Sequence, residues 1–337
     1  MIRIGMIGAG RHATKMLYPC LHFAGMELAA VCDQDEAKAI RNAHWFGARQ
    51  VYTDHQRMLE TEKLDAVIIC TGPTTHAALT IDCLEHHLPV FVEKPPAINQ
   101  AEVNRVRQRS EELGTPVMVG TMKRYALVYQ KMHAIMQQPE FGSISAVQAR
   151  MSVGWKNGNG FALLLDAGIH LIDLLRFLMG EVTQVSFQKH EDRETSLSYV
   201  ILFKFASGAA GSLLISDRCS WMSANERVEI VGEGNLLCAE NLTRLTHYQA
   251  DGKTQVWEPG FSIPCNENQL HFIGGYAGEM QAFAAAVENH QSFSPGIADA
   301  CADYAILKAI EPDEVYSKGP QTHPHWEAEE AWLKIHH

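Results

Sequence analysis

Several features are missing from this chain of 337 residues, and each absence excludes a class of protein. No apolar run approaches the ~20 residues that a membrane-spanning helix needs, so we expect no membrane partner. The net charge is −11 and no basic block occurs, so we expect no nucleic-acid partner. The first residues lack the charged region, apolar region and cleavage site of a secretory signal, so we expect none.

Paired cysteines and metal-binding spacings are missing as well. The eight cysteines are scattered, none lies in a C-x-x-C pair, and several fall inside apolar runs, where cysteine behaves as a small hydrophobe. We therefore expect reduced thiols and a cytoplasmic protein. The 17 histidines include no H-E-x-x-H motif and no cysteine–histidine spacing typical of zinc, so we expect no metal site.

What is present begins with the first dozen residues. The apolar residues 4–7 lead into Gly8-Ala9-Gly10 and then Arg11-His12-Ala13, which predicts a strand, a tight turn and the start of a helix. In this G-x-G-x-x-A pattern, Gly8 permits the turn, Gly10 lets a pyrophosphate approach, and Ala13 allows helix and strand to pack closely. The helix start offers free N–H groups to phosphates, so the pattern predicts a dinucleotide site.

An acidic residue supports this interpretation. Asp33 ends a second apolar run, residues 28–32, and follows Ala13 by 20 residues, about the distance expected in such a unit. Its carboxylate would accept hydrogen bonds from the adenosine ribose hydroxyls and repel a 2′-phosphate. We therefore predict NAD as the cofactor, with NADP less favoured. The alternative is an ordinary turn followed by an unrelated surface aspartate.

The order of elements predicts an α/β protein with two domains. Over residues 1–121, apolar strands alternate with helices, which is typical of a doubly wound parallel sheet. Residues 122–337 instead carry consecutive strand-like runs at 144–153, 183–190, 196–205, 209–216 and 227–231, with helices expected at 163–179, 276–289 and 297–309. These runs predict an α+β domain with a largely antiparallel sheet.

Polar residues follow three strands of the first domain at their carboxyl ends, where doubly wound sheets bind ligands. The strand ends lead into Thr71-Gly72-Pro73-Thr74-Thr75-His76, Glu93-Lys94-Pro95-Pro96 and Gly120-Thr121-Met122-Lys123-Arg124. A single such loop could simply be solvated. The two prolines stiffen the turn that presents Lys94, and an X-Pro bond in a tight turn can be cis.

A second group of chemical residues lies on the helix expected at 163–179. Asp166 and His170 are four residues apart and share a helix face, and Asp173 follows three residues later. A carboxylate beside a histidine can fix its tautomer and tune its pKa for general acid–base work near neutral pH. The alternative is a structural pair that braces the helix.

Together these residues resemble the glucose–fructose oxidoreductase/inositol dehydrogenase (Gfo/Idh/MocA) family over essentially the whole chain, to about residue 319. The resemblance rests on the glycine pattern, the Thr71…Pro73…His76 loop, Glu93-Lys94-Pro95, Arg124, and Asp166-x-x-x-His170-x-x-Asp173. It implies a Rossmann domain followed by an α+β domain whose open sheet often forms an oligomer interface. We therefore expect a homodimer or homotetramer that oxidises or reduces a sugar, cyclic polyol or related alcohol with NAD(P).

The resemblance also implies roles for individual residues. Lys94 would contact both the substrate hydroxyl and the cofactor, His170 would transfer the proton, and Asp166 would orient His170 or bind substrate. The expected cofactor contacts are Gly8, Ala9, Gly10, Arg11, His12, Asp33, Thr71, Pro73, His76, Glu93, Lys94 and Arg124. The expected substrate contacts are Lys94, Arg124, Tyr125, Trp155, Asp166 and His170, with Lys156 and Asn157 as further candidates.

Three departures from the family pattern concern the substrate pocket. Gly158-Asn159-Gly160-Phe161-Ala162 stands where the family commonly has adjacent glycines, no proline follows Arg124-Tyr125, and the segment 310–315 is unusual. Two other functions remain open. A non-catalytic dinucleotide-binding sensor of the same fold has no chemical need for Lys94, Asp166 and His170 together, and a metal-dependent alcohol dehydrogenase would need metal ligands.

Overall fold

The computed structural model describes residues 1–154, 158–192, 196–219, 225–260 and 269–317. Its first half contains six strands, with short turns of π-helix (η1) and 3-10 helix (η2) at two strand ends. In chain order the elements are β1 (Arg3–Ile7), η1 (Ala13–Leu17), α1 (Tyr18–Phe23), β2 (Glu27–Cys32), α2 (Glu36–Phe46), β3 (Gln50–Tyr52), α3 (His55–Thr61), β4 (Ala66–Ile69), α4 (Pro73–Glu85), β5 (Val90–Glu93), α5 (Gln100–Leu113), β6 (Val117–Gly120) and η2 (Met122–Tyr125).

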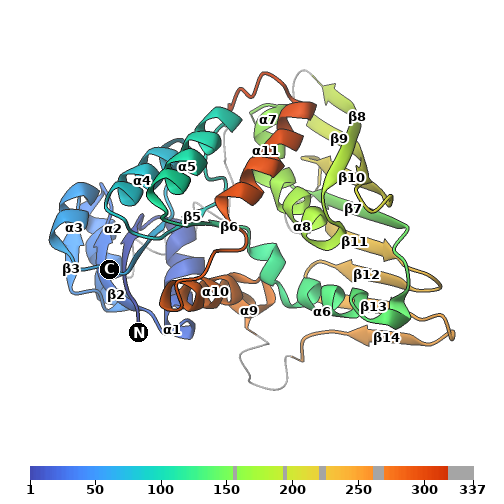
Figure 1. The fold of residues 1–337 in the computed structure, drawn as a ribbon, viewed down its shortest axis with the longest axis horizontal. Coiled ribbons are helices and arrows are strands. Elements are labelled where there is room, and N and C mark those ends of the chain that lie inside the picture. The colour runs from blue at the N-terminus through green and yellow to red at the C-terminus, as the bar shows by residue number, and fades with distance from the viewer. Residues whose placement is uncertain (155–157, 193–195, 220–224, 261–268, 318–337) are drawn as a thin grey trace.

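The first sheet is parallel throughout, with the strand order β3-β2-β1-β4-β5-β6. The strand order reverses beside β1, and the crevice at such a reversal is where doubly wound sheets bind ligands. β4 reads Ala-Val-Ile-Ile and is wholly buried, because helices cover both faces of the sheet. Figure 1 shows α4 and α5 on one side of this sheet and α1 on the other.

Local sequence determines where the helices begin and end. Asp35 caps α2 by accepting a hydrogen bond from the Lys38 amide, and Gly47 ends that helix with a φ of 80°. Asn99 caps α5 in the same way, at 2.9 Å from the Glu102 amide. These caps place the loops that follow each strand at one edge of the sheet, where the candidate site lies.

The second half contains an eight-stranded sheet and most of the remaining helices. Its elements are α6 (Leu127–Met136), η3 (Pro139–Phe141), β7 (Ala146–Ser152), α7 (Gly160–Leu163), η4 (Leu164–Gly168), α8 (Ile169–Met179), β8 (Val182–Asp192), β9 (Ser196–Phe205), β10 (Ala210–Ser216), β11 (Asn225–Val231), β12 (Leu236–Glu240), β13 (Arg244–Tyr248), β14 (Thr254–Trp257), α9 (Leu270–Ile273), α10 (Tyr276–Glu288) and α11 (Ile297–Ile310).

The strand order of this sheet is β14-β13-β12-β11-β7-β10-β9-β8. All neighbouring strands are antiparallel except β7 and β10, which are parallel. The predicted α/β class with a largely antiparallel second sheet is thus confirmed. The strands β12, β13 and β14 and the helices α6 and α9 were not predicted, because short strands and short helices give little periodic signal.

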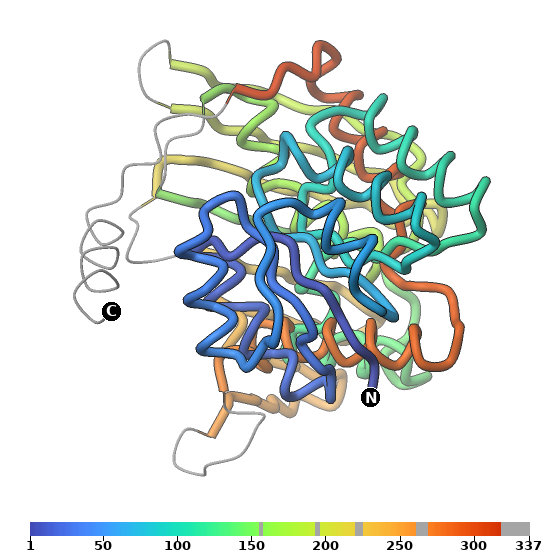
Figure 2. Tube along the Cα trace, turned by 90° about the vertical axis from the view of Figure 1, so that its left-hand side faces the viewer, coloured from blue at the N-terminus to red at the C-terminus, as the bar shows by residue number. Residues whose placement is uncertain are grey.

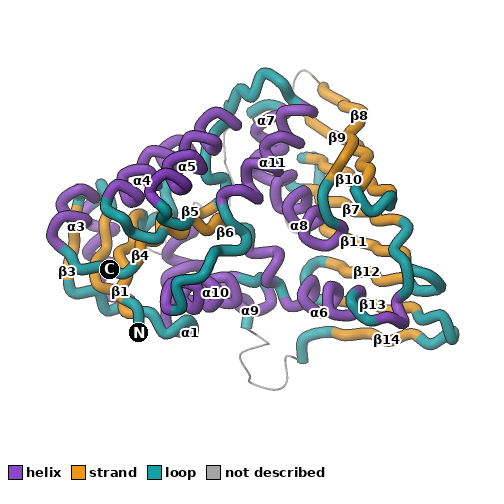
Figure 3. Tube along the Cα trace, in the orientation of Figure 1, coloured by secondary structure: helices purple, strands orange, loops and turns teal. Residues whose placement is uncertain are grey.

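Helices of the second half fill the space between the two sheets (Figure 3). α11 packs on both α5 and α8, and α10 packs on α1, so two late helices return to the first sheet. Figure 2 shows the blue N-terminal half lying in front of the second sheet. One hydrophobic core extends across the predicted boundary between residues 1–121 and 122–337. The division into two domains therefore stays a prediction from the sequence.

Candidate active site

The turn after β1 has the geometry of a phosphate-binding loop. Gly8 has a φ of 109°, and a Cβ there would overlap the carbonyl oxygen of Cys70, so only glycine fits. A Cβ on Gly10 would meet no atom within 4 Å, which leaves open space over the backbone at that point. The buried Ala13 starts η1 and packs in the core beneath the turn.

Asp33 directly follows β2, beside this turn. One carboxylate oxygen accepts a hydrogen bond from the Ala9 amide at 2.7 Å, and the other accepts one from the Asp35 amide at 2.9 Å. The side chain therefore holds the glycine turn against the end of β2. Each carboxylate oxygen has further acceptor capacity for ribose hydroxyls.

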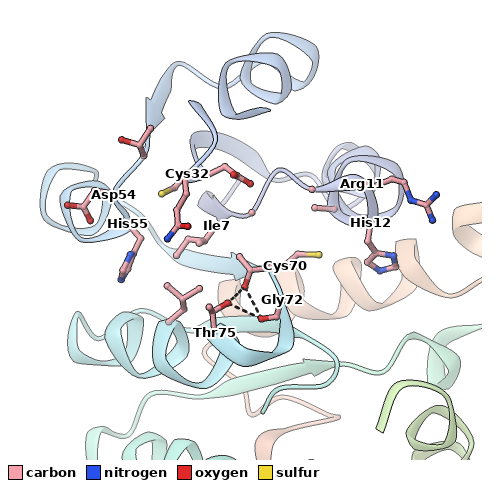
Figure 4. A pocket seen from close by; sticks show the side chains of 17 residues that line it. Ile7, Arg11, His12, Cys32, Asp54, His55, Cys70, Gly72 and Thr75 are labelled. Atoms are coloured by element: carbon pink, nitrogen blue, oxygen red, sulfur yellow. Dashed lines mark hydrogen bonds between the residues drawn. The ribbon is translucent and has the colours of Figure 1, made fainter. Parts of the chain in front are cut away.

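An elongated cleft of about 680 Å³ opens along these strand ends. Figure 4 shows Arg11 and His12 at one end of the cleft, Asp54 and His55 at the other, and Thr75 with Gly72 on its floor. This volume lies within the range of small-molecule sites. The lining includes the expected cofactor contacts Gly8, Gly10, Arg11, His12, Asp33 and Thr71, and also Gly72 and Thr75 of the polar loop expected at a strand end. It further includes Cys32, Gln34, Thr53, Asp54, His55, Cys70 and Leu79, which the sequence did not indicate as cofactor contacts.

The unpredicted lining residues Thr53, Asp54 and His55 follow β3 directly. The rule that ligands lie at the carboxyl ends of parallel strands applies to β3 as well as to its neighbours. Applying it there would have found these residues. The other expected cofactor contacts do not line this cleft, namely Ala9, Pro73, His76, Glu93, Lys94 and Arg124.

His76 instead connects two of the predicted loops. It is buried, its Nε2 accepts from the Thr71 amide at 3.1 Å, and its Nδ1 lies 2.8 Å from the Pro95 carbonyl oxygen. These two partners require a neutral ring with the proton on Nδ1. Burial lowers the pKa of His76, consistent with that state. Pro95, which His76 contacts, is joined to Lys94 by a cis peptide bond.

Glu93 links the cleft to Lys94. Its buried carboxylate lies 3.1 Å from His12 Nε2 and accepts from the Lys94 amide at 2.9 Å. Burial alone would raise the pKa of Glu93, but the charges of His12 and Lys94 hold it below its ordinary value. The charged Glu93 therefore connects His12, in the wall of the cleft, to the turn that carries Lys94.

The two predicted chemical groups meet at the other side of this turn. Lys94 Nζ donates to the backbone carbonyl of Asp166 at 3.0 Å, which joins β5 to the π-helical turn η4. His170 lies one turn further, on α8. Its Nδ1 is buried and has no hydrogen-bond partner among the described residues. Burial and then the charges of Lys94, Lys123 and His12 lower the pKa of His170 well below its ordinary value.

Arg124 and Asp173 form a pair of their own. Arg124 donates two hydrogen bonds to Asp173, at 2.6 and 2.9 Å, and lies 3.2 Å from Asp299 of α11. Arg124 and Asp173 are both buried, so this pair fixes η2 against α8. The hydroxyl of the neighbouring Tyr125 donates to the Ser294 carbonyl. The structure thus places these side chains in contacts between elements, and Trp155, Lys156 and Asn157 lie outside the described residues.

Lys123 lies in the polar loop expected after the last strand of the first domain, but the sequence indicated no role for it. It is buried, it pairs with Glu226 of β11, and its charge acts on His170. Tyr129 donates to the other oxygen of Glu226 at 2.5 Å.

The described residues hold no group of three side chains able to bind a metal ion. In the same part of the chain, every helix is too short or too polar to cross a membrane.

Sequence models of known protein families match parts of both halves of the chain. A sequence model of the Gfo/Idh/MocA oxidoreductase family, described as an NAD-binding Rossmann fold, matches residues 2–121. The model of the C-terminal domain of the same family matches residues 129–237.

Individual relatives agree with these matches. The chain is 27% identical to the scyllo-inositol 2-dehydrogenase (NAD(+)) of Bacillus subtilis, over 86% of each chain. It is 26% identical to the myo-inositol 2-dehydrogenase of Thermotoga maritima, over 73% of this chain and 77% of the relative. In fold it is similar to a dehydrogenase from Chromobacterium violaceum, with a TM-score of 0.85 and 23% identity over 93% of this chain and 95% of the other.

Proposed function

The chain belongs to the Gfo/Idh/MocA family of oxidoreductases, and we propose that it moves a hydride between a nicotinamide dinucleotide and a CH–OH group of a sugar or cyclic polyol. Two relatives are named as inositol 2-dehydrogenases, which supports this substrate class. The observation that carries the proposal is the contact of Lys94 Nζ with Asp166, one helical turn from the neutral His170. Motifs 72 residues apart in sequence thereby meet at one point.

We propose NAD as the cofactor. The residues fit a dinucleotide, because the space over Gly10 is open and Asp33 ends the strand beside it. The Asp33 carboxylate would accept the ribose hydroxyls and repel the 2′-phosphate of NADP. Titrating the protein with NADH and with NADPH tests this preference, and tighter binding of NADPH would refute it.

The protein's own residues supply the proton chemistry. A nicotinamide bound in the cleft would supply the acceptor for the hydride of the carbinol carbon. The neutral His170 accepts the hydroxyl proton as the C–O bond gains carbonyl character. The Lys94 ammonium stabilises the negative charge that develops on that oxygen. Burial strengthens both effects, because water screens charges less in a closed site.

A direct assay tests the activity. Purified protein is mixed with NAD⁺ and a panel of cyclic polyols, aldoses and sugar acids, and NADH absorbance is followed. Turnover of any member is the expected result. Silence across the panel with NADH still bound would favour the alternative, a non-catalytic dinucleotide-binding sensor of the same fold.

We further propose that the chain forms a homodimer or homotetramer through the open face of its second sheet. Helices cover one face of this sheet, and the other carries six exposed apolar side chains from five strands, at Val200, Leu202, Leu214, Val231, Tyr248 and Val256. Charged side chains such as Arg227 and Glu229 share this face, and the exposed apolar side chains gathered on it favour an interaction surface. A second copy of the chain offers the same surface and fits a closed two-fold contact.

A further inference from the structure

The segment after the last described helix returns to the active site. Residues 311–317, which we call the C-terminal strap, run from the end of α11 toward the start of α5 (Figure 1). Side chains and backbone groups of several other elements hold them in place. The strap includes part of the segment that departs from the family pattern.

Charged groups anchor the C-terminal strap at two residues, Glu311 and Glu314. Glu311 pairs with Lys189 of β8 at 2.9 Å and accepts a hydrogen bond from the Tyr199 hydroxyl. Glu314 accepts from the Gln100 amide at the start of α5 at 2.7 Å and pairs with Lys308 at 3.0 Å. The strap is thus tied to both the second sheet and the first domain.

Asn159 provides the next anchor. Its side-chain amide donates to the Val315 carbonyl at 2.6 Å, while its oxygen caps α7 by accepting from the Ala162 amide at 2.9 Å. A Cβ on the adjacent Gly160 would overlap the Tyr199 hydroxyl and lie 2.7 Å from Glu311. The altered glycine segment and the unusual C-terminal segment are therefore in contact, and each fits the other.

The strap brings Tyr316 to the catalytic motif. Its hydroxyl lies 3.3 and 3.4 Å from the two carboxylate oxygens of Asp166. Burial and the Asp166 charge raise the pKa of Tyr316, so its hydroxyl keeps its proton and acts as the donor. The backbone carbonyl of the same Asp166 accepts from Lys94. Asp166 is thus held at two points. The Tyr316 hydroxyl contacts its carboxylate, and the Lys94 ammonium donates to its backbone carbonyl.

We propose that Tyr316 is a positioning residue that holds the Asp166 carboxylate toward a substrate hydroxyl beside the reacting carbon. The substrate is then a vicinal diol, with one oxygen at Lys94 and His170 and its neighbour at Asp166. The strap supplies this contact only because Asn159 and Glu311 anchor it. This inference rests on the proposed dehydrogenase function.

The test compares two tyrosine variants on the diol that the panel assay shows to be turned over best. For Tyr316→Phe, we expect KM for the diol to rise about tenfold, because a hydrogen bond to a charged group is lost in ground state and transition state alike. The value of kcat stays within about twofold and the Kd for NADH is unchanged. Tyr52→Phe is the matched control, because it removes a tyrosine hydroxyl that donates to the Glu62 carboxylate at 2.7 Å, and it leaves all three constants unchanged.

A second variant tests the strap itself. Asn159→Ser keeps an oxygen that caps α7 but removes the amide that holds Val315. We expect KM to rise about threefold for this variant, and the double variant with Tyr316→Phe to be no worse than Tyr316→Phe alone by more than about twofold, because the two act through one contact.

Two results would overturn the inference while leaving the proposed function intact. Tyr316→Phe could behave like Tyr52→Phe, or it could lower kcat with KM unchanged, which would place Tyr316 in the chemical step. A wild-type chain that turns over no member of the panel would remove the proposed function itself and this inference with it.

Discussion

Glu279 is a carboxyl group with an unusual environment. It lies in the first turn of α10, it is fully buried, and neither side-chain oxygen has a hydrogen-bond partner among the described residues. Burial and then the nearby charge of Glu93 raise its pKa well above the ordinary value. Of these two carboxyls, Glu93 keeps the charge because His12 and Lys94 face it, and Glu279 keeps the proton.

This environment predicts a pH-dependent effect of Glu279→Gln. An acid whose pKa is raised on folding contributes stability that is present below its ordinary value of 4.5 and lost as pH rises through the raised value. Glutamine resembles the protonated acid and does not titrate. The variant should therefore gain stability over wild type as pH rises from 5 to 8, by up to about 1.4 kcal/mol per pH unit. Urea unfolding at several pH values measures this difference.

The control for this measurement is Glu288→Gln, at the exposed end of the same helix. Its difference from wild type should stay constant between pH 5 and 8, because an exposed ion pair adds little to stability. A Glu279→Gln curve parallel to wild type over that range would mean that Glu279 is ionised in the folded protein.

The chemistry at His170 predicts the effect of removing it. His170→Ala should lower kcat by about 10² to 10⁴, because the substrate hydroxyl loses its proton acceptor. The Kd for NADH should not change, since His170 does not line the dinucleotide cleft. Steady-state kinetics and NADH titration measure the two constants, and His190→Ala, on the exposed edge strand β8, is the control. Equal loss of turnover and NADH binding would make His170 structural.

The lowered pKa of His170 also predicts a pH profile. Burial and the Lys94 charge keep the ring neutral, and hence able to accept a proton, down to a pH well below 6.5. The acid limb of kcat/KM for alcohol oxidation should therefore lie below pH 6.5. A limb above pH 7 would contradict this assignment, because it would require a charged His170 at neutral pH.

At the scale of elements, two glycines of one turn should respond differently to the same change. Gly8→Ala places a side chain against the Cys70 carbonyl at a φ of 109°, which we expect to cost about 2–4 kcal/mol of stability. Gly10→Ala meets no protein atom within 4 Å, so its melting temperature should stay within about 2 °C of wild type. Its Kd for NADH should nevertheless rise about tenfold or more.

Thermal unfolding and NADH titration on both variants separate these effects. A destabilised Gly10→Ala would mean that the turn itself needs glycine there. A Gly10→Ala protein with unchanged NADH affinity would remove the phosphate role of this turn.

Element patterns also explain which parts of the protein could be predicted. Strands such as β1 and β4 are continuous apolar runs between glycines or polar loops, so their place and the parallel sheet followed from periodicity. The strands β12 to β14 are only four or five residues long, so each carries too little alternation to be recognised, although consecutive antiparallel pairings join them. The parallel pairing of β7 with β10 could not be predicted for another reason, because two α-helices, a π-helical turn and two strands separate them in the chain.

At the scale of the whole molecule, the sequence indicated where its motif residues lie better than which residues they contact. Gly8, Asp33 and Lys94 lie where their motifs place them, because each belongs to a local unit. The pairing of Arg124 with Asp173 and the approach of Tyr316 to Asp166 join segments 49 and 150 residues apart. No local pattern encodes such contacts, since they follow from how α11 and the strap pack.

The open face of the second sheet supports the last prediction. Leu202 is 51% exposed, and Val200 and Leu214 are exposed beside it on the same face. A charge at Leu202 would be buried without a partner in any contact between two such faces, which costs several kcal/mol. Leu202→Asp should therefore dissociate an oligomeric wild type into monomers of 37.5 kDa, as measured by analytical ultracentrifugation.

Ile40→Asp, on the exposed face of α2, is the control for that measurement and should leave the assembly intact. If Leu202→Asp remains in the wild-type assembly, the open face is not the interface. If both variants dissociate, the effect is one of general surface charge. A monomeric Leu202→Asp that still oxidises the substrate would show that each subunit contains a complete site, as expected when Lys94, Asp166, His170 and Tyr316 meet within one chain.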